Sequence, residues 1–152
     1  MKVIFLDFDG VLNSRRTVAA YGCYGFLGFR DGYHLDPVAL KMVEVLCKDT
    51  SASIVISSSW RIGADLQEFK DLFDHYKIDV NVVGFTPRSY EIGEIRGHEI
   101  EAYLVKHPQI THYAILDDDS DMLETQKAHF VHVNPTDGLS WKNFEQAKKI
   151  LL

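Results

Sequence analysis

Cysteine is scarce in this sequence, with only Cys23 and Cys47 among 152 residues. Two thiols this far apart make neither a disulfide framework nor the close-spaced pair typical of a zinc site. A long apolar run is also missing. Residues 1–6 are too few for a signal peptide or a membrane span before Asp7 interrupts them. We therefore expect reduced thiols, a cytoplasmic location and no membrane partner.

An excess of positive charge is absent too, because the formal net charge is −6. This balance argues against broad electrostatic binding of nucleic acid, which requires a basic face. The net charge does not exclude a local basic pocket. Six arginines lie in or beside predicted loops: Arg15, Arg16, Arg30, Arg61, Arg88 and Arg96. The apolar share of 46% and the length are ordinary for one globular domain, which we expect to span residues 1–152.

Short apolar segments rich in β-forming residues alternate with segments of helical periodicity. The predicted strands are residues 2–6, 53–57, 79–84, 112–116 and 129–133, and the predicted helices are residues 37–48, 64–76, 97–107 and 141–152. The alternation indicates βαβ units and an α/β fold with a mostly parallel sheet. Residues 13–35, rich in glycine and aromatics, have no clear periodicity. We predict a flap-like excursion there, with aromatics that pack on the core rather than stack on a substrate base.

Polar side chains follow three of the predicted strands. Asp7 and Asp9 follow the first, Ser57–Ser59 the second, and an acidic group the fourth: Asp117, Asp118, Asp119 and Asp121. Each group alone is equally well explained as turn or helix-cap chemistry. Together, in a parallel sheet, they converge on the edge where ligands bind. Clustered carboxylates repel unless a cation compensates, and their hard oxygens suit Mg²⁺.

The segment Asp7-Phe8-Asp9-Gly10-Val11-Leu12-Asn13, placed after an apolar strand, resembles the first motif of the haloacid-dehalogenase-like (HAD) superfamily. Ile54-Val55-Ile56-Ser57 resembles the second motif, and Ile115-Leu116-Asp117-Asp118 the fourth. Order and spacing match over about residues 2–125. Four segments together are most similar to the small HAD domains of nucleic-acid repair proteins: Ser58-Ser59-Trp60-Arg61, Thr86-Pro87-Arg88, Arg96-Gly97-His98-Glu99-Ile100 and Leu116-Asp117-Asp118-Asp119-Ser120-Asp121. The resemblance implies a Rossmann-like three-layer fold and a Mg²⁺-dependent phosphatase.

The resemblance also implies a role for each site residue. Asp7 is the nucleophile that forms an aspartyl-phosphate, and Asp9 is the general acid and base. Ser57, Ser58 and a basic third-motif residue hold the phosphoryl group. The metal ligands are Asp7, the backbone carbonyl of Asp9, and Asp117 or Asp118.

Two of these assignments leave alternatives. Arg96 is the preferred third-motif residue because it opens the helix before the fourth-motif strand, and Arg88 is the other candidate. Asp117 is preferred over Asp118 as metal ligand. Asp121 has the spacing of a second supporting acid.

The gaps between motifs are too short for a large cap domain, so the enzyme resembles the capless members. An open site admits large phosphorylated substrates, such as a polynucleotide end, as well as a nucleotide. The alternatives are a phosphoprotein or small-metabolite phosphatase, and a non-catalytic module that binds Mg²⁺ or a partner. A dehalogenase is less favoured because Asp9 is typical of phosphatases. A response-regulator receiver is less favoured because its acceptor ends a middle strand.

Overall fold

The computed structural model describes residues 1–22, 34–88 and 95–152 of the chain. Its centre is a sheet of five strands: β1 (Lys2–Leu6), β2 (Ala52–Ile56), β3 (Val82–Phe85), β4 (His112–Asp117) and β5 (Phe130–His132). Every neighbouring pair is parallel, and the strand order is β3-β2-β1-β4-β5. The predicted α/β fold with a parallel sheet is therefore confirmed.

The central strand β1 is covered on both faces. Residues Val3 to Leu6 are fully buried, and their side chains alternate between two hydrophobic clusters. Ile4 and Leu6 belong to the larger cluster and Phe5 to the smaller one. Burial on both faces explains why this strand has a continuous apolar run instead of an apolar–polar alternation.

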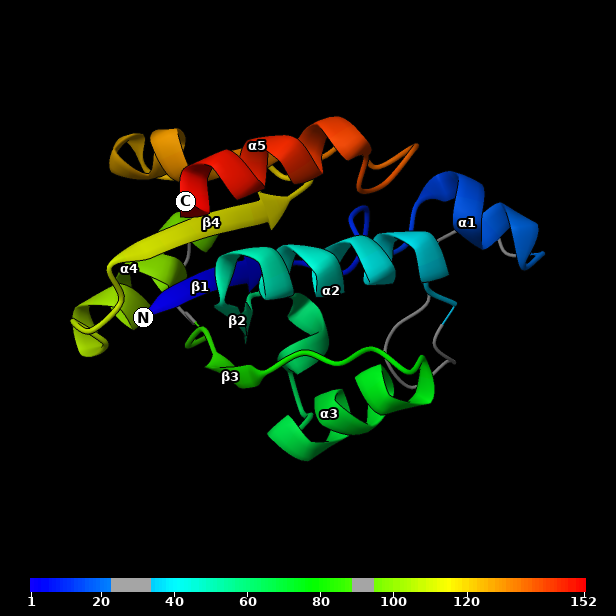
Figure 1. Ribbon diagram of the computed structural model, residues 1–152, viewed down its shortest axis with the longest axis horizontal. Coiled ribbons are helices and arrows are strands. Elements are labelled where there is room, and N and C mark those ends of the chain that lie inside the picture. The colour runs from blue at the N-terminus through cyan, green and yellow to red at the C-terminus, as the bar shows by residue number, and fades with distance from the viewer. Residues whose placement is uncertain (23–33, 89–94) are drawn as a thin grey trace.

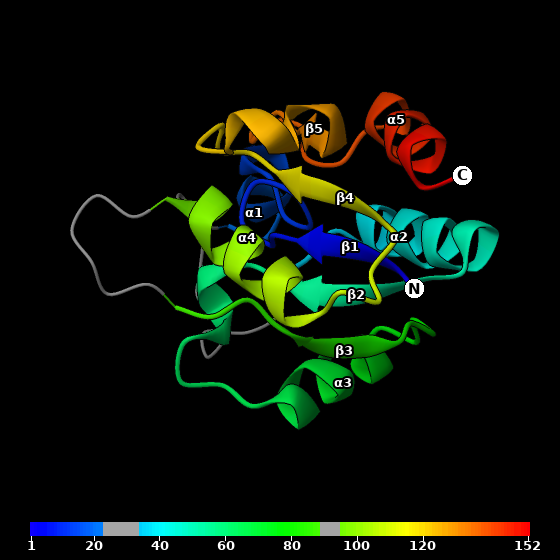
Figure 2. The same cartoon turned by 90° about the vertical axis from the view of Figure 1, so that its left-hand side faces the viewer.

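Helices cover the two faces unequally. The larger cluster lies under α2 (Pro37–Thr50), α3 (Leu66–His75) and α5 (Trp141–Leu151), whereas α4 (Arg96–Lys106) covers the smaller one. Figures 1 and 2 show the sheet between α2 and α5 on one side and α4 on the other. The arrangement is the predicted Rossmann-like three-layer fold. Among the described residues, no segment forms a separate cap domain.

The segment predicted as a flap contains a helix that the sequence did not indicate. Helix α1 (Arg15–Ala20) begins after Ser14, whose hydroxyl accepts a hydrogen bond from the Thr17 backbone N–H at 3.1 Å. Six residues are too few to show helical periodicity. Most of the aromatics of this segment fall in residues 23–33, outside the described part of the chain, so their packing stays a prediction.

Cys47 is buried, and Cys23 lies outside the described residues. None of the helices described here combines the length and apolarity that a membrane crossing requires.

The strand order determines where a ligand can bind. The chain moves from β1 outward to β2 and β3, then returns to the other side of β1 to form β4 and β5. The order of the strands thus reverses between β1 and β4. In open α/β sheets, the crevice beyond the carboxyl ends of two such strands is the usual ligand site.

Candidate active site

Four polar side chains form a row at the carboxyl edge of the sheet. The pairings of Leu6 with Ile56 and Leu116, and of Ile56 with Phe85, place the residues that follow them side by side. In the order of the strands, this row is Thr86, Ser57, Asp7 and Asp117. Since side chains alternate along a strand, the row faces away from the larger cluster and toward α4. Register alone therefore gathers residues from four separate segments.

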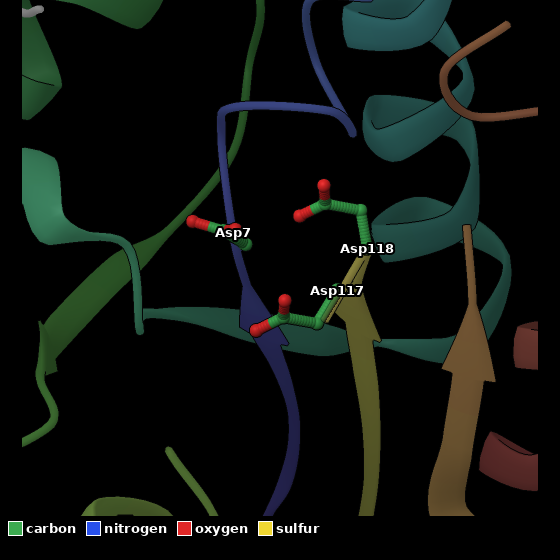
Figure 3. A group of neighbouring side chains, drawn as sticks. All are labelled: Asp7, Asp117 and Asp118. Atoms are coloured by element: carbon green, nitrogen blue, oxygen red, sulfur yellow. The ribbon is translucent and has the colours of Figure 1, made fainter. Parts of the chain in front are cut away.

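Three acids meet at the β1–β4 junction. One carboxylate oxygen each from Asp7, Asp117 and Asp118 lies within 4.8 Å of the others. Figure 3 shows the carboxyl groups of Asp117 and Asp118, at the end of β4, converging on Asp7 at the end of β1. Asp7 is only 6% exposed and Asp117 is fully buried. Hard oxygen donors of this kind, partly withdrawn from water, fit the ligand preference of Mg²⁺.

Burial and mutual repulsion make these acids hard to ionise without a cation. Burial, and after it the charge of Asp7, raise the pKa of Asp117 to about 8 and that of Asp118 to about 6. Burial also raises the pKa of Asp7, although the Arg96 charge and a hydrogen bond from Ser58 oppose the shift. A bound divalent cation would reverse this balance by favouring all three carboxylates.

Gly10 allows the acids to come this close. Its φ of +76° is a left-handed conformation that favours glycine. A Cβ atom at this position would lie 2.5 Å from Asp118 Cγ, which is closer than two non-bonded carbon atoms approach in proteins. The glycine of the first motif thus serves both the turn after β1 and the position of Asp118.

Arg96 is the cation that the structure places beside the acids. Its Nη1 lies 3.8 Å from Asp7 Oδ1 and 3.8 Å from Asp117 Oδ2. Burial lowers the pKa of Arg96, but the charges of Asp7 and Asp117 outweigh it and the net shift is upward. Arg88 lies instead in the wall of a neighbouring pocket. Asp121 accepts a hydrogen bond from the Arg96 backbone N–H at 3.0 Å and so caps α4.

Asp9 is held by two side chains that donate to its carboxylate. Asn13 Nδ2 donates to Oδ1 at 2.9 Å, and Trp60 Nε1 donates to Oδ2 at 3.1 Å. Asn13 Oδ1 in turn accepts the Gly10 backbone N–H at 2.9 Å. Asn13 and Trp60 were noted in the sequence only as members of motif segments, with no role of their own. Trp60 and Asp9 are 51 positions apart in the chain, so the local sequence pattern did not reveal their contact.

The two serines of the second motif differ in what they contact. Ser58 is fully buried, hydrogen-bonds to Asp7 and accepts the Trp60 backbone N–H at 3.3 Å. Ser57 is equally buried, but its hydroxyl has no hydrogen-bond partner. Thr86, for which no role was predicted, is 2% exposed and likewise has an unpartnered hydroxyl. Its position directly after the third strand was not visible in the sequence, because that strand was predicted to end at residue 84 and β3 ends at Phe85.

Unsatisfied polar atoms are concentrated at this edge. Within the described residues, five buried side-chain atoms have no hydrogen-bond partner, and His34 Nδ1 is the only one outside the site. The other four are Ser57 Oγ, Thr86 Oγ1, Arg96 Nη1 and Asp117 Oδ2. Each such atom costs about 1–3 kcal/mol unless a ligand or water satisfies it. Three potential hydrogen-bond donors and one carboxylate oxygen at the carboxyl edge of the sheet therefore have no hydrogen-bond partner within the described residues.

Comparison with known proteins identifies the family. The family model described as "HAD domain in Swiss Army Knife RNA repair proteins" matches residues 3–144. The chain belongs to this HAD-domain family. The resemblance found in the motifs is thereby confirmed. Searches of the curated proteins and of the solved structures found no match.

Arg61 links the loops that carry the site residues of this HAD domain. All five of its N–H groups are used. Nε donates to Thr86 O, Nη1 donates to the carbonyl oxygens of Ser57 and Ser58, and Nη2 donates to Pro87 O and to Glu99 Oε2. Glu99 Oε2 also lies 3.9 Å from Arg96 Nε. The loop after β2, the loop after β3 and the start of α4 are therefore held together by one buried guanidinium.

Proposed function

We propose that this HAD domain is a Mg²⁺-dependent phosphohydrolase that acts through an aspartyl-phosphate on Asp7. A nucleic-acid end or a nucleotide phosphate is the substrate that we favour. The observation that carries the proposal is the set of unsatisfied buried atoms around Asp7. A phosphate monoester brings several acceptor oxygens to Ser57 Oγ and Arg96 Nη1, and a cation brings a partner for Asp117 Oδ2.

Asp7 is the nucleophile in this proposal. Its carboxylate oxygen attacks phosphorus, the bond from phosphorus to the leaving oxygen breaks, and Asp9 gives that oxygen a proton. Water then attacks the phosphoryl group on Asp7, Asp9 takes the proton of the water, and inorganic phosphate departs with the Asp7 carboxylate restored. Asn13 and Trp60 hold Asp9 in place for both proton transfers.

The donors beside Asp7 supply the electrostatic part of catalysis. Phosphoryl transfer depends mainly on in-line positioning and on stabilising charge on the equatorial oxygens. In this proposal Ser57 and Arg96 donate to these oxygens, which their unpartnered donor atoms support, while Ser58 orients Asp7. Because Arg61 binds the carbonyl groups of both serines, it supports the loop that carries these donors.

Asp7, Asp117, Asp118 and the backbone carbonyl of Asp9 are the groups that would hold Mg²⁺. The bound cation would neutralise charge on the phosphoryl oxygens. The all-oxygen donor set and the unpartnered Asp117 Oδ2 support this assignment. Both Asp117 and Asp118 are close enough to take part.

Two alternatives make different predictions. A phosphoprotein or small-metabolite phosphatase would use the same residues, and the family description, which refers to RNA repair, favours a nucleic-acid substrate. A non-catalytic module would bind Mg²⁺ or a partner without turnover. The two hydrogen bonds that position Asp9 favour catalysis, because Asp9 lies outside the three-acid cluster.

The test is phosphate release from a panel containing an aryl phosphate, nucleotides, and oligonucleotides with 3′- or 5′-terminal phosphates. We expect release with Mg²⁺ but not with EDTA, and loss of at least about 10³-fold in Asp7→Asn, because the nucleophile is removed. Asp74→Asn removes the same charge from an exposed position on α3 and is the matched control. Mg²⁺ binding without release from any member would instead favour the non-catalytic module.

A further inference from the structure

Glu99 lies between two largely buried arginines. It stands on the first turn of α4, three residues after Arg96, and residues at this spacing are neighbours on one helix face. One oxygen, Oε2, accepts a hydrogen bond from Arg61 Nη2 at 2.7 Å and lies 3.9 Å from Arg96 Nε. The three side chains are only 6–16% exposed, so water screens their charges less than it does at the surface.

Arg61 fixes the position of Glu99. Its other N–H groups donate to backbone carbonyl oxygens of the loops after β2 and β3, namely those of Ser57, Ser58, Thr86 and Pro87. The Glu99 carboxylate is therefore anchored to two loops as well as to its own helix. Asp121 holds the backbone of Arg96 by accepting its N–H at 3.0 Å, so the guanidinium and the backbone of Arg96 have separate anchors.

The Arg96 guanidinium interacts with acids through two different nitrogens. Nε faces Glu99, whereas Nη1 lies 3.8 Å from both Asp7 Oδ1 and Asp117 Oδ2. At this distance Nη1 hydrogen-bonds to neither carboxylate, and it has no other hydrogen-bond partner in the described residues. The attraction between Glu99 and Nε opposes a movement of Nη1 onto Asp7 or Asp117, which Coulomb attraction would otherwise favour.

We propose that Glu99 is a positioning residue of the phosphoryl-binding site. It holds the Arg96 guanidinium so that Nη1 stays available to a phosphoryl oxygen and does not pair with Asp7 or Asp117. The helix dipole alone favours an acid on the first turn of a helix, but that role requires neither arginine contact. This inference rests on the proposed function and adds to it a residue that acts through Arg96.

Charge and position predict opposite effects of Glu99→Gln on the binding of inorganic phosphate. Removal of a negative charge near the site would by itself strengthen binding of an anion. Loss of the anchor on Arg96 Nε should weaken it, because Nη1 then pairs with the acids. We expect the dissociation constant, measured by calorimetry in Mg²⁺, to rise about tenfold, as for the loss of one charge-assisted hydrogen bond. Glu101→Gln removes the same charge from an exposed position on α4 and should leave the constant nearly unchanged.

Two further measurements separate position from charge. Glu99→Asp keeps the charge but is one methylene group shorter, so it should also raise the dissociation constant, whereas a role of charge alone would leave it unchanged. In an Arg96→Gln background, where no Nε remains, Glu99→Gln should have almost no effect on the constant. Circular dichroism should show that each variant is folded, since the amide of Glu99→Gln can still accept a hydrogen bond from Arg61 Nη2.

An unchanged or lower dissociation constant in Glu99→Gln would overturn the inference, as would an equal loss of affinity in the Arg96→Gln background or a wild-type protein that does not bind phosphate. Turnover of the substrate panel tests the proposed function separately. Release that depends on Asp7, with a phosphate affinity indifferent to Glu99, would retain the phosphatase and reject the positioning role. The expected affinities without release from any substrate would reject the phosphatase and retain the role of Glu99.

Discussion

The substitution Asp117→Asn should stabilise the metal-free protein. Asp117 is fully buried beside Asp7 and Asp118, and burial raises its pKa to about 8 from an ordinary value of 3.8. Below pH 3.8 the folded and unfolded forms are both protonated, so the acid has no net effect on stability. Above that pH the unfolded chain ionises first, and the folded state loses stability until the pH exceeds the folded pKa of about 8.

The size of the effect follows from the pKa shift. A carboxyl titrating alone would cost about 1.36 kcal/mol for each pH unit above 3.8, or about 4 kcal/mol at pH 7. The sharing of a proton with Asp7 reduces this cost, and we expect about 2 kcal/mol. For a chain of this length that corresponds to about 4–8 °C in Tm. The variant amide can still accept the Asp119 backbone N–H, now 3.0 Å from Asp117 Oδ1.

Thermal unfolding followed by circular dichroism at pH 5 and pH 8, in EDTA and in Mg²⁺, measures these effects. The wild-type Tm should fall from pH 5 to pH 8 in EDTA, and Mg²⁺ should restore it. Asp117→Asn should have the higher Tm at pH 8 in EDTA and respond little to Mg²⁺. Glu44, whose pKa Lys41 and the Asp79 backbone N–H lower to about 2, titrates below this window. A lower Tm for Asp117→Asn in EDTA at pH 8, or a full response to Mg²⁺, would refute the reasoning.

Two further substitutions test the positioning of the site residues. Trp60→Phe keeps the ring but removes the donor to Asp9, and kcat should fall about tenfold for an alkyl phosphate, which needs a proton on its leaving oxygen. An aryl phosphate with an acidic leaving group should be nearly unaffected, and an equal loss on both substrates would contradict the assignment. Gly10→Ala should lose at least about 2 kcal/mol of stability through its φ of +76° and the contact with Asp118. Urea unfolding measures this loss, and Gly22→Ala, with a similar φ but open space around it, should lose less.

The sequence predicted the parts of this fold that depend on local pattern. The apolar run of β1 and the polar residues after it identified a buried strand ending at Asp7, because burial on both faces leaves no polar position within the strand. The same rule located Ser57 and Asp117 at their strand ends. Helix α1 was missed because a six-residue helix between loops has no periodic signal of its own.

The sequence pattern did not predict contacts between segments that are distant in the chain. Thr86 joins the row only because β3 pairs with β2 at one particular register, which includes an irregularity between Ile54 and Val55. Arg61, placed in a loop, would ordinarily be expected at the surface. It is 8% exposed because backbone carbonyls of two loops and Glu99 together satisfy every N–H group. No local rule indicates that five acceptors will meet at one arginine.

The charge balance of the site links cation binding to substrate binding. Asp7, Asp117 and Asp118 contribute three acids within a few ångströms, and in the described residues Arg96 is the cation that ion-pairs with two of them. A phosphate monoester adds up to two more negative charges at the same place. One guanidinium cannot offset that sum in a site sheltered from water. Phosphate should therefore bind weakly to the metal-free protein, and Mg²⁺ should increase its affinity. Linkage requires phosphate to tighten Mg²⁺ binding by the same factor.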